Sequence, residues 1–148
     1  MFKNFQSLLL VMIPLVMMSV ATPARSADET FATYKYVLQA SDMDPSKQIL
    51  VLNNASNLLE AYPPGAVQVE IVAYGPGLRL LFAENENAKR IDSLSQSGVK
   101  FSACGNTLQA MTKLLGYEPK LNPDATVVPG GVVRIGDLQR KGYAYIKP

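Results

Sequence analysis

Strand-like and helix-like patterns alternate along the chain from residue 33 to its end, and this alternation limits the fold more than any other feature. Five short stretches are rich in β-branched, aromatic and other apolar residues, as strands are. Between them, apolar residues recur at helical spacing. The expected strands are 33–40, 66–74, 99–103, 125–128 and 143–147, and the expected helices are 44–62, 86–98, 106–116 and 130–142. Because parallel strands need crossover connections, the sequence predicts an α/β layered domain with a mainly parallel sheet.

Local signals mark where two of these helices begin. Asp44 and Pro45 supply an N-cap residue and a first-turn proline for the first helix. Asn106, with Gln109 three residues later, resembles a capping box at the start of the third helix. An apolar stripe along that helix is expected to face the core, and it consists of Leu108, Met111, Leu114 and Leu115.

The first 26 residues have the pattern of a secretory signal peptide. Lys3 provides the positive start, an apolar run extends from Leu8 to Val20, and Ala24 and Ser26 occupy the −3 and −1 positions of a cleavage site. The alternative is a membrane anchor, but the run is shorter than the roughly 20 apolar residues that a spanning helix needs. We therefore expect export to the periplasm, a mature domain of residues 27–148, and no membrane attachment after cleavage.

The charge balance argues against a nucleic-acid partner. Removal of residues 1–26 takes away two of the 14 basic residues and none of the 12 acidic ones, so the mature chain has no net charge. Binding to a phosphate backbone calls for a clustered basic face, and the sequence shows no such cluster.

The residue inventory excludes several chemistries. The chain has no histidine and a single cysteine, Cys104, which rules out Ser-His-Asp and Cys-His catalysis and the usual zinc sites. There is no P-loop, no complete dinucleotide fingerprint and no CxxC pair. We expect no metal and no cofactor, and any sulfur chemistry must use one thiol.

Glycine-rich turns follow the expected strands, at the sheet edge where ligands bind in open α/β folds. They let backbone approach a ligand closely. The alternative is that these glycines only form tight turns. The candidate binding residues at these strand ends are Tyr74, Gly75, Gly77, Gly105 and Asn106.

Cys104 has two competing interpretations. It is expected to follow a strand and to precede the next helix by about two residues, where exposed N–H groups and the helix dipole favour the thiolate. Against this, free cysteines are often buried and inert. Position alone leaves both interpretations open.

Three segments, read together, resemble the DsrE/DsrF-like family, and specifically its small exported members within the sulfur-relay superfamily. They are VEIVAYGPGLRLL (69–81), NAKRIDSLSQSGVKFSACGNTL (87–108) and VVPGGVVRIGDLQRKGYAYIKP (127–148). The resemblance implies a Rossmann-like three-layer fold of about five strands flanked by helices, assembled as a homo-oligomer, a trimer or hexamer. In relay members, a cysteine matching Cys104 accepts sulfane sulfur as a persulfide and passes it to a partner protein.

Three functions therefore stand side by side. The first is a periplasmic sulfur-handling protein with Cys104 as persulfide carrier, in which Arg79 attracts an anionic donor and Asn53 and Asn57 are weaker candidates. The second is a non-catalytic binding or assembly module with an inert cysteine. The third is a thiol sensor that dimerises through Cys104. The alternative for Arg79, Asn53 and Asn57 is that they are solvated surface side chains, as arginine and asparagine usually are. The sequence does not show whether the chain turns over a substrate, so it leaves open whether the protein is an enzyme.

Overall fold

The computed structural model describes residues 33–148, so the expected signal peptide and its cleavage site lie outside the described residues. All the expected strands and helices are confirmed within that range. In chain order the elements are β1 (Tyr34–Ala40), α1 (Pro45–Ala61), β2 (Val67–Ala73), the 3-10 helix η1 (Gly75–Leu81), α2 (Ala88–Gln96), β3 (Lys100–Cys104), α3 (Gly105–Leu115), β4 (Ala125–Val128), α4 (Gly131–Arg140) and β5 (Ala144–Ile146).

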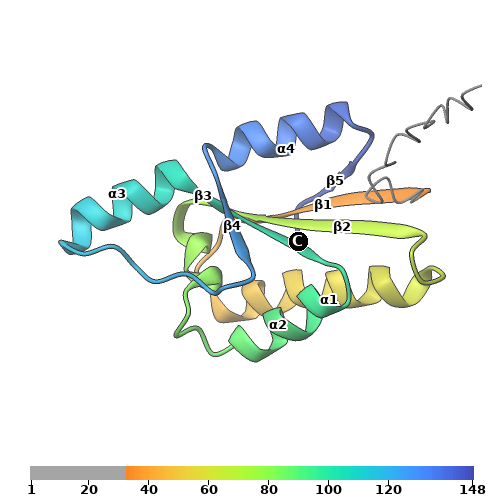
Figure 1. The fold of residues 1–148 in the computed structure, drawn as a ribbon, viewed down its shortest axis with the longest axis horizontal. Helices are drawn as coiled ribbons and strands as arrows, with labels where there is room; N and C mark the ends of the chain where they lie inside the picture. Colours follow the sequence, from red (N-terminus) through yellow and green to blue (C-terminus); the bar gives the residue numbers. More distant parts are fainter. Residues whose placement is uncertain (1–32) are drawn as a thin grey trace, which may run out of the picture.

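The five strands form one parallel sheet in the order β4-β3-β2-β1-β5. The chain adds β2, β3 and β4 on one side of β1 and then returns to place β5 on the other side. Right-handed crossovers put helices on opposite faces when the direction of winding reverses. Accordingly, α1 and α2 cover one face and α4 covers the other (Figure 1). The expected Rossmann-like three-layer α/β fold is confirmed.

The two faces of the sheet are buried to different extents. The face toward α1 and α2 carries the main core, which includes Leu38, Ile71 and Phe101. The face toward α4 has a smaller apolar cluster of Val37, Val72, Ile135 and Leu138. α4 lies over β1, β2 and β3, and the sheet beside it is hollowed into a groove of about 530 Å³ along β3 and β4.

The first helix starts as its sequence predicts. The Asp44 carboxylate accepts the backbone N–H of Ser46 at 2.8 Å, and Pro45 occupies the first helical position, where no N–H is needed. The helix ends before Pro63 and Pro64, which cannot continue it.

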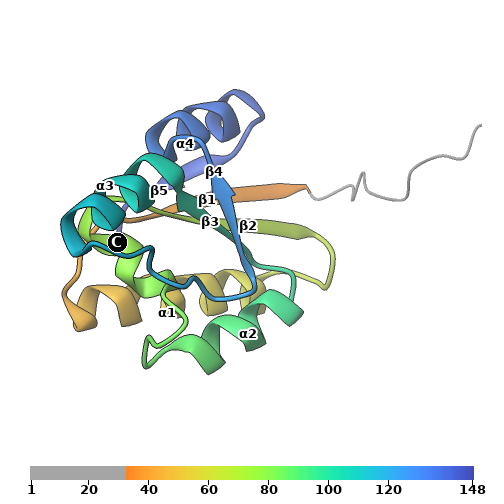
Figure 2. The same ribbon diagram turned by 60° about the vertical axis from the view of Figure 1, so that its left-hand side comes forward.

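The start and the packing of α3 differ from the sequence prediction. α3 begins at Gly105, so Cys104 itself holds the N-cap position, and no side-chain cap forms at Asn106. Of the expected stripe, Leu108 is buried, whereas Leu114 is 81% exposed. The helix projects past the carboxyl edge of the sheet, so its last turns face no second layer (Figures 1 and 2). Periodicity identified the apolar side of α3, but the chain covers this side only in the first turns, at Leu108 and partly at Met111, and leaves Leu114 exposed.

Among residues 33–148, no helix is long and apolar enough to cross a membrane. In the same range, no three His, Cys, Asp or Glu side chains are grouped so that they could hold a metal ion.

Candidate functional site

Cys104 lies where the connections of two neighbouring strands diverge. It is the last residue of β3 and pairs with Val128 at the end of β4. The chain leaves β3 into α3, beyond the sheet edge, and leaves β4 into α4, on the other face. In open α/β folds, ligands bind at such points. Here two grooves are lined by neighbours of Cys104, one by Val128 and the other by Thr107, but neither is lined by Cys104 itself. The side chain shares a sheet face with Ser102 and is directed toward α4, and the residue is 5% exposed.

The N-termini of two helices meet at the sulfur of Cys104. Polar donors lie around the thiol: the Thr107 side chain and the backbone N–H groups of Gly131 at the start of α4 and of Thr107 and Asn106 at the start of α3, although the thiol forms no regular side-chain cap on α3. Burial raises the pKa of the thiol, but these donors favour the thiolate and outweigh burial. The pKa of Cys104 is therefore lowered below its ordinary value, as at other helix N-termini.

The four donors do not contribute equally. The N–H of Asn106 also points at the carbonyl oxygen of Pro129, at 3.2 Å, so this donor is shared. Thr107 and Gly131 have the larger effect on the thiol pKa. Asn106 was a candidate from the sequence, whereas Thr107 and Gly131 were not singled out. A hydroxyl residue three positions after the cysteine, in the first turn of the helix, was the available signal for Thr107.

The loop after β2 orients the Thr107 hydroxyl. The backbone N–H of Gly75 donates to Thr107 Oγ1 at 3.0 Å. Because the oxygen is occupied as an acceptor, the hydroxyl hydrogen is free to point at the sulfur. Gly75 has φ +53°, a left-handed conformation that favours glycine. Gly75 thus belongs to the site through its backbone, as a residue that positions Thr107.

Tyr74 contacts the site through Gly131. A Cβ added to Gly131 would lie 2.8 Å from the Cβ of Tyr74, so the first residue of α4 packs directly on this tyrosine. Burial, followed by the electrostatic effect of the neighbouring Tyr145, raises the pKa of Tyr74. Tyr74 therefore forms the wall that sets how closely α4 approaches the sheet.

The other predicted residues have structural or peripheral places. A Cβ on Gly77 would lie 2.3 Å from the carbonyl oxygen of Ala40, so this glycine allows η1 to pack on the end of β1. Gly105 is half-buried, and a Cβ there would lie 3.1 Å from the carbonyl oxygen of Val128. Gly105 therefore shapes the backbone beside the thiol, whereas Gly77 shapes the end of β1, which is separated from β3 by β2.

The three weaker candidates are not brought to Cys104. Asn53 is exposed on α1 and accepts a hydrogen bond from Arg90 of α2 at 2.5 Å, on the opposite side of the sheet from α4. Asn57 is also exposed on α1. Arg79 is exposed and lines an apolar groove of about 330 Å³ together with Thr107, Met111 and Leu114.

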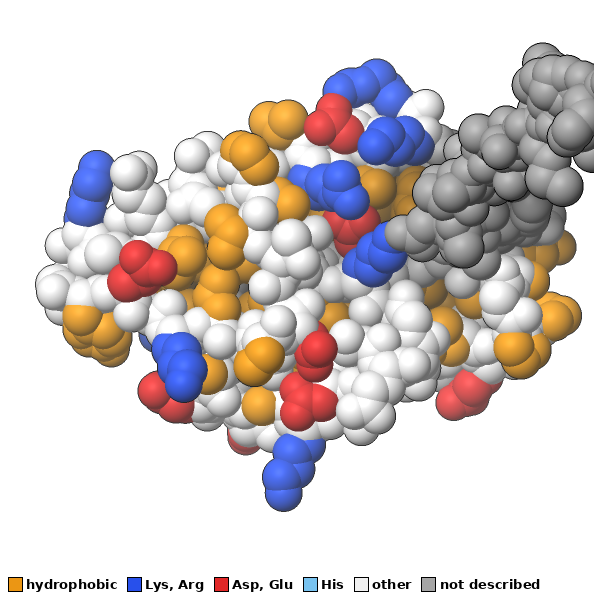
Figure 3. Space-filling model, in the orientation of Figure 1, with side chains coloured by type: hydrophobic (Ala, Val, Ile, Leu, Met, Phe, Trp, Pro, Cys, Tyr) orange, Lys and Arg blue, Asp and Glu red, His pale blue; other side chains and the backbone are white. Residues whose placement is uncertain are grey.

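Apolar side chains surround the approach to the thiol. Val127 of β4 is 51% exposed, and Val132 and Val133 in the first turn of α4 are 66% and 65% exposed. Hydrophobic side chains also reach the surface between α3 and β4 in the view of Figure 3. A further groove of about 650 Å³ lies near the amino ends of β2 and β3, beside Val67 and Lys100, and does not include Cys104.

The fold and the position of Cys104 define a Rossmann-like α/β protein with one thiol at the carboxyl edge of its parallel sheet. The chain belongs to the DsrE/DsrF-like family, whose family model matches residues 16–148. The expected family is thereby confirmed, and with it a fold of the sulfur-relay type.

Two solved structures are similar to this chain. MTH1491 from Methanobacterium thermoautotrophicum, described as a protein of unknown function, is 34% identical with a TM-score of 0.71, over 78% of this chain and 99% of that one. BT1422 from Bacteroides thetaiotaomicron, also of unknown function, is 14% identical with a TM-score of 0.50, over 77% of this chain and 94% of that one, and shares the fold alone. No curated protein matches the chain.

Proposed function

We propose that the protein carries sulfane sulfur as a persulfide on Cys104. The observation that supports this most directly is the place of Cys104 at the end of β3 and the N-cap of α3, where the Thr107 hydroxyl and the Gly131 and Thr107 N–H groups lower the pKa of its thiol. These donors favour an anion, and both the thiolate and the perthiolate derived from it are anions. An inert core cysteine has no need of such a set of donors.

The proposed reaction needs no cofactor. The Cys104 thiolate attacks the outer sulfur of a donor R–S–SH, the sulfur–sulfur bond of the donor breaks, and R–S⁻ leaves with the bonding electron pair. Cys104 then carries –S–SH. In the return step, an acceptor thiolate attacks that outer sulfur and Cys104 leaves as thiolate. A lowered pKa makes Cys104 a better leaving group in the second step.

The presence of a single cysteine fits a carrier. The chain has no second thiol that could attack the persulfide and close an internal disulfide. A bound sulfur is therefore retained until an external acceptor arrives. The valines around the thiol provide an apolar surface against which a sulfur donor or acceptor protein docks.

Export and assembly are part of the proposal. The leader pattern of residues 1–26 supports a periplasmic location. The apolar side chains that α3 and its surroundings expose, among them Leu114 at 81% and Tyr117 at 64%, support a homo-oligomer, a trimer or hexamer, in which they are covered.

One observation favours a second function. Cys104 is only 5% exposed, which is also what a binding or assembly module with an inert cysteine would show. The two functions differ in how the thiol of the folded protein reacts with small reagents.

The deciding experiment measures alkylation of the purified protein against pH, with intact mass as the readout, and then treats the protein with polysulfide. A persulfide carrier shows a thiol pKa below about 8.5 and gains the mass of one sulfur atom, reversible by a phosphine. Cys104→Ser is the control that must gain nothing. A thiol that stays silent until the protein is unfolded would assign the chain to the binding or assembly module.

A further inference from the structure

The carboxylate of Glu70 is buried under α4. It bonds one residue of β3 and one residue of α4, the two elements that lie beside the thiol. Glu70 of β2 is 1% exposed and lies on the same sheet face as Ser102 and Cys104. Its Oε1 accepts the hydroxyl of Ser102 at 2.6 Å and Nε of Arg134 at 2.7 Å, and its Oε2 accepts Nη2 of Arg134 at 2.8 Å. Every buried side-chain nitrogen and oxygen in the described residues has a hydrogen-bond partner, so the cluster is complete.

This ion pair needs an explanation beyond stability. Burial of a charged pair costs desolvation energy that its attraction only partly offsets, and apolar replacements are often as stable. Buried pairs are best attested as devices that fix the register of one element on another. The arginine fork adds geometric precision, because two parallel N–H groups meet the two carboxylate oxygens.

The ion pair connects the two elements that hold the thiol. Arg134 lies one helical turn after Gly131, and its N–H bonds the carbonyl oxygen of Gly130 at 2.9 Å. On the sheet side, Ser102 is two residues before Cys104, on the same face of β3. The ion pair therefore attaches α4 to the sheet close to the thiol. On the helix, it lies one turn from Gly131, and on β3 its partner Ser102 lies two residues from Cys104.

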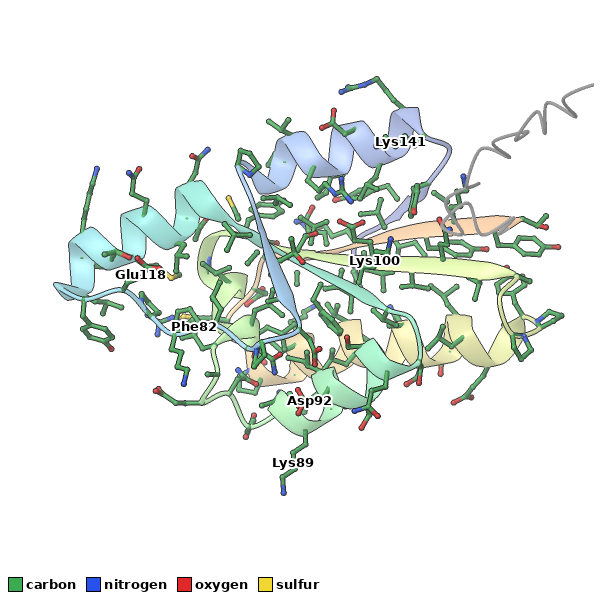
Figure 4. All side chains as sticks on the ribbon, in the orientation of Figure 1. Phe82, Lys89, Asp92, Lys100, Glu118 and Lys141 are labelled. Carbon is green, nitrogen blue, oxygen red and sulfur yellow. The ribbon has the colours of Figure 1, made fainter. Side chains whose placement is uncertain are left out.

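The close contact between Gly131 and Tyr74 limits where the start of α4 can lie on the sheet. Gly131 touches Tyr74 with no room for a Cβ, so the start of α4 is confined between this wall and the ion pair. The open side of the cluster faces the groove along β3 and β4, where Lys100 lies on the same sheet face (Figure 4). A change in the position of α4 on the sheet would change the distance between the Gly131 N–H and the sulfur.

We propose that Glu70 and Arg134 are positioning residues for Cys104, which hold the start of α4 so that the Gly131 N–H stays on the thiolate and perthiolate. This inference rests on the proposed function, since it assigns the pair a role in keeping the carrier thiol anionic.

The test compares Arg134→Lys with Arg140→Lys. Lysine keeps the positive charge but loses the fork, so an effect of Arg134→Lys reports geometry and not charge. Arg140 pairs with Asp137 on the exposed side of the same helix, which makes it the matched control. The readouts are the alkylation rate against pH and the hydrogen exchange of the Gly131 amide, measured on variants whose circular dichroism and melting match the wild type.

For Arg134→Lys we expect a raised thiol pKa, alkylation at neutral pH roughly threefold to tenfold slower, and faster exchange at Gly131, as for the loss of one hydrogen bond to an anion. Ser102→Ala, which loosens the pair from the sheet side, should act in the same direction. Wild-type behaviour of both variants at the thiol and at Gly131 would overturn the inference.

The polysulfide reaction separates this inference from the proposed function. If the wild type takes up sulfur and Arg134→Lys alkylates like the wild type, the carrier function is supported and the positioning role is refuted. If the wild type takes up no sulfur and Arg134→Lys has a raised thiol pKa, the carrier function is refuted and the positioning role is supported.

Discussion

Gly75 donates its backbone N–H to Oγ1 of Thr107 at 3.0 Å, across 32 positions of the sequence. This bond joins the turn after β2 to the first turn of α3. It also decides what the Thr107 hydroxyl does, because an oxygen that accepts from Gly75 is free to donate its hydrogen to the sulfur of Cys104.

Thr107→Val should raise the pKa of the Cys104 thiol, since valine keeps the shape of threonine and loses the hydroxyl. We expect alkylation at neutral pH to slow roughly fivefold, the effect of about one hydrogen bond. Thr107→Ser keeps the hydroxyl and should alkylate like the wild type. Equal rates for the valine and serine variants would show that the hydroxyl does not act on the thiol.

The stability of the protein should depend on pH through Cys104. Its pKa is lowered in the folded state, so the unfolded state binds the thiol proton more tightly and stability rises with pH. The contribution is complete above the unfolded value of about 8.5 and is lost as the pH falls through the folded pKa.

Urea unfolding of the wild type and of Cys104→Ser, each under reducing conditions, measures this difference. The free energy of unfolding of the wild type, minus that of the serine variant, should increase as the pH rises toward about 8.5. A difference that stays constant over this range would mean that the folded thiol has its ordinary pKa.

Gly77→Ala should destabilise the fold by roughly 1–3 kcal/mol, the range for an overpacked site. Its Cβ would lie 2.3 Å from the backbone oxygen of Ala40, and backbone at the end of β1 cannot move aside as a flexible side chain can. Gly136→Ala is the matched control within α4, where a Cβ meets only the end of Arg140 at 3.7 Å and helix propensity favours alanine. In urea unfolding, the free energy of unfolding should fall for Gly77→Ala and should not fall for Gly136→Ala.

Leu114→Lys should dissociate the proposed homo-oligomer without unfolding the protomer. Leu114 is 81% exposed on α3, so a lysine there costs the isolated chain little, while a covered lysine at an interface is unfavourable. Gln109→Lys adds the same charge to an exposed position of the same helix and is the control. Sedimentation velocity should show smaller species for Leu114→Lys alone, and a monomeric wild type would remove the proposed oligomer.

The order of strands and helices was predictable from the sequence because it depends on local periodicity. The proline at the start of α1 and the β-branched residues of the strands favour a backbone conformation only for themselves and for the residues next to them. The exposure of Leu114 was not predictable in the same way, because a hydrophobic stripe shows which side of a helix is apolar and not whether another layer faces it.

The position of Cys104 at the end of a strand was also predictable, whereas most of its partners were not. Gly131 and Arg134 come from a helix that follows β4, and they reach the thiol and Glu70 only because the winding reverses after β4. Glu70 lies inside an apolar strand, where a lone charge gives no sign of its partner 64 positions away. Contacts of this kind depend on topology, which one sequence does not determine locally.

The origin of Gly131 in a later segment has a consequence for how the protein matures. A chain that has been synthesised or refolded only as far as β4 already contains Cys104 and the start of α3, but it lacks the N–H group that α4 brings. Its thiol therefore ionises less readily than that of the finished protein. The ionisation of Cys104 therefore depends on the packing of the last helix, whose first residue follows the cysteine by 27 positions in the sequence (131 − 104).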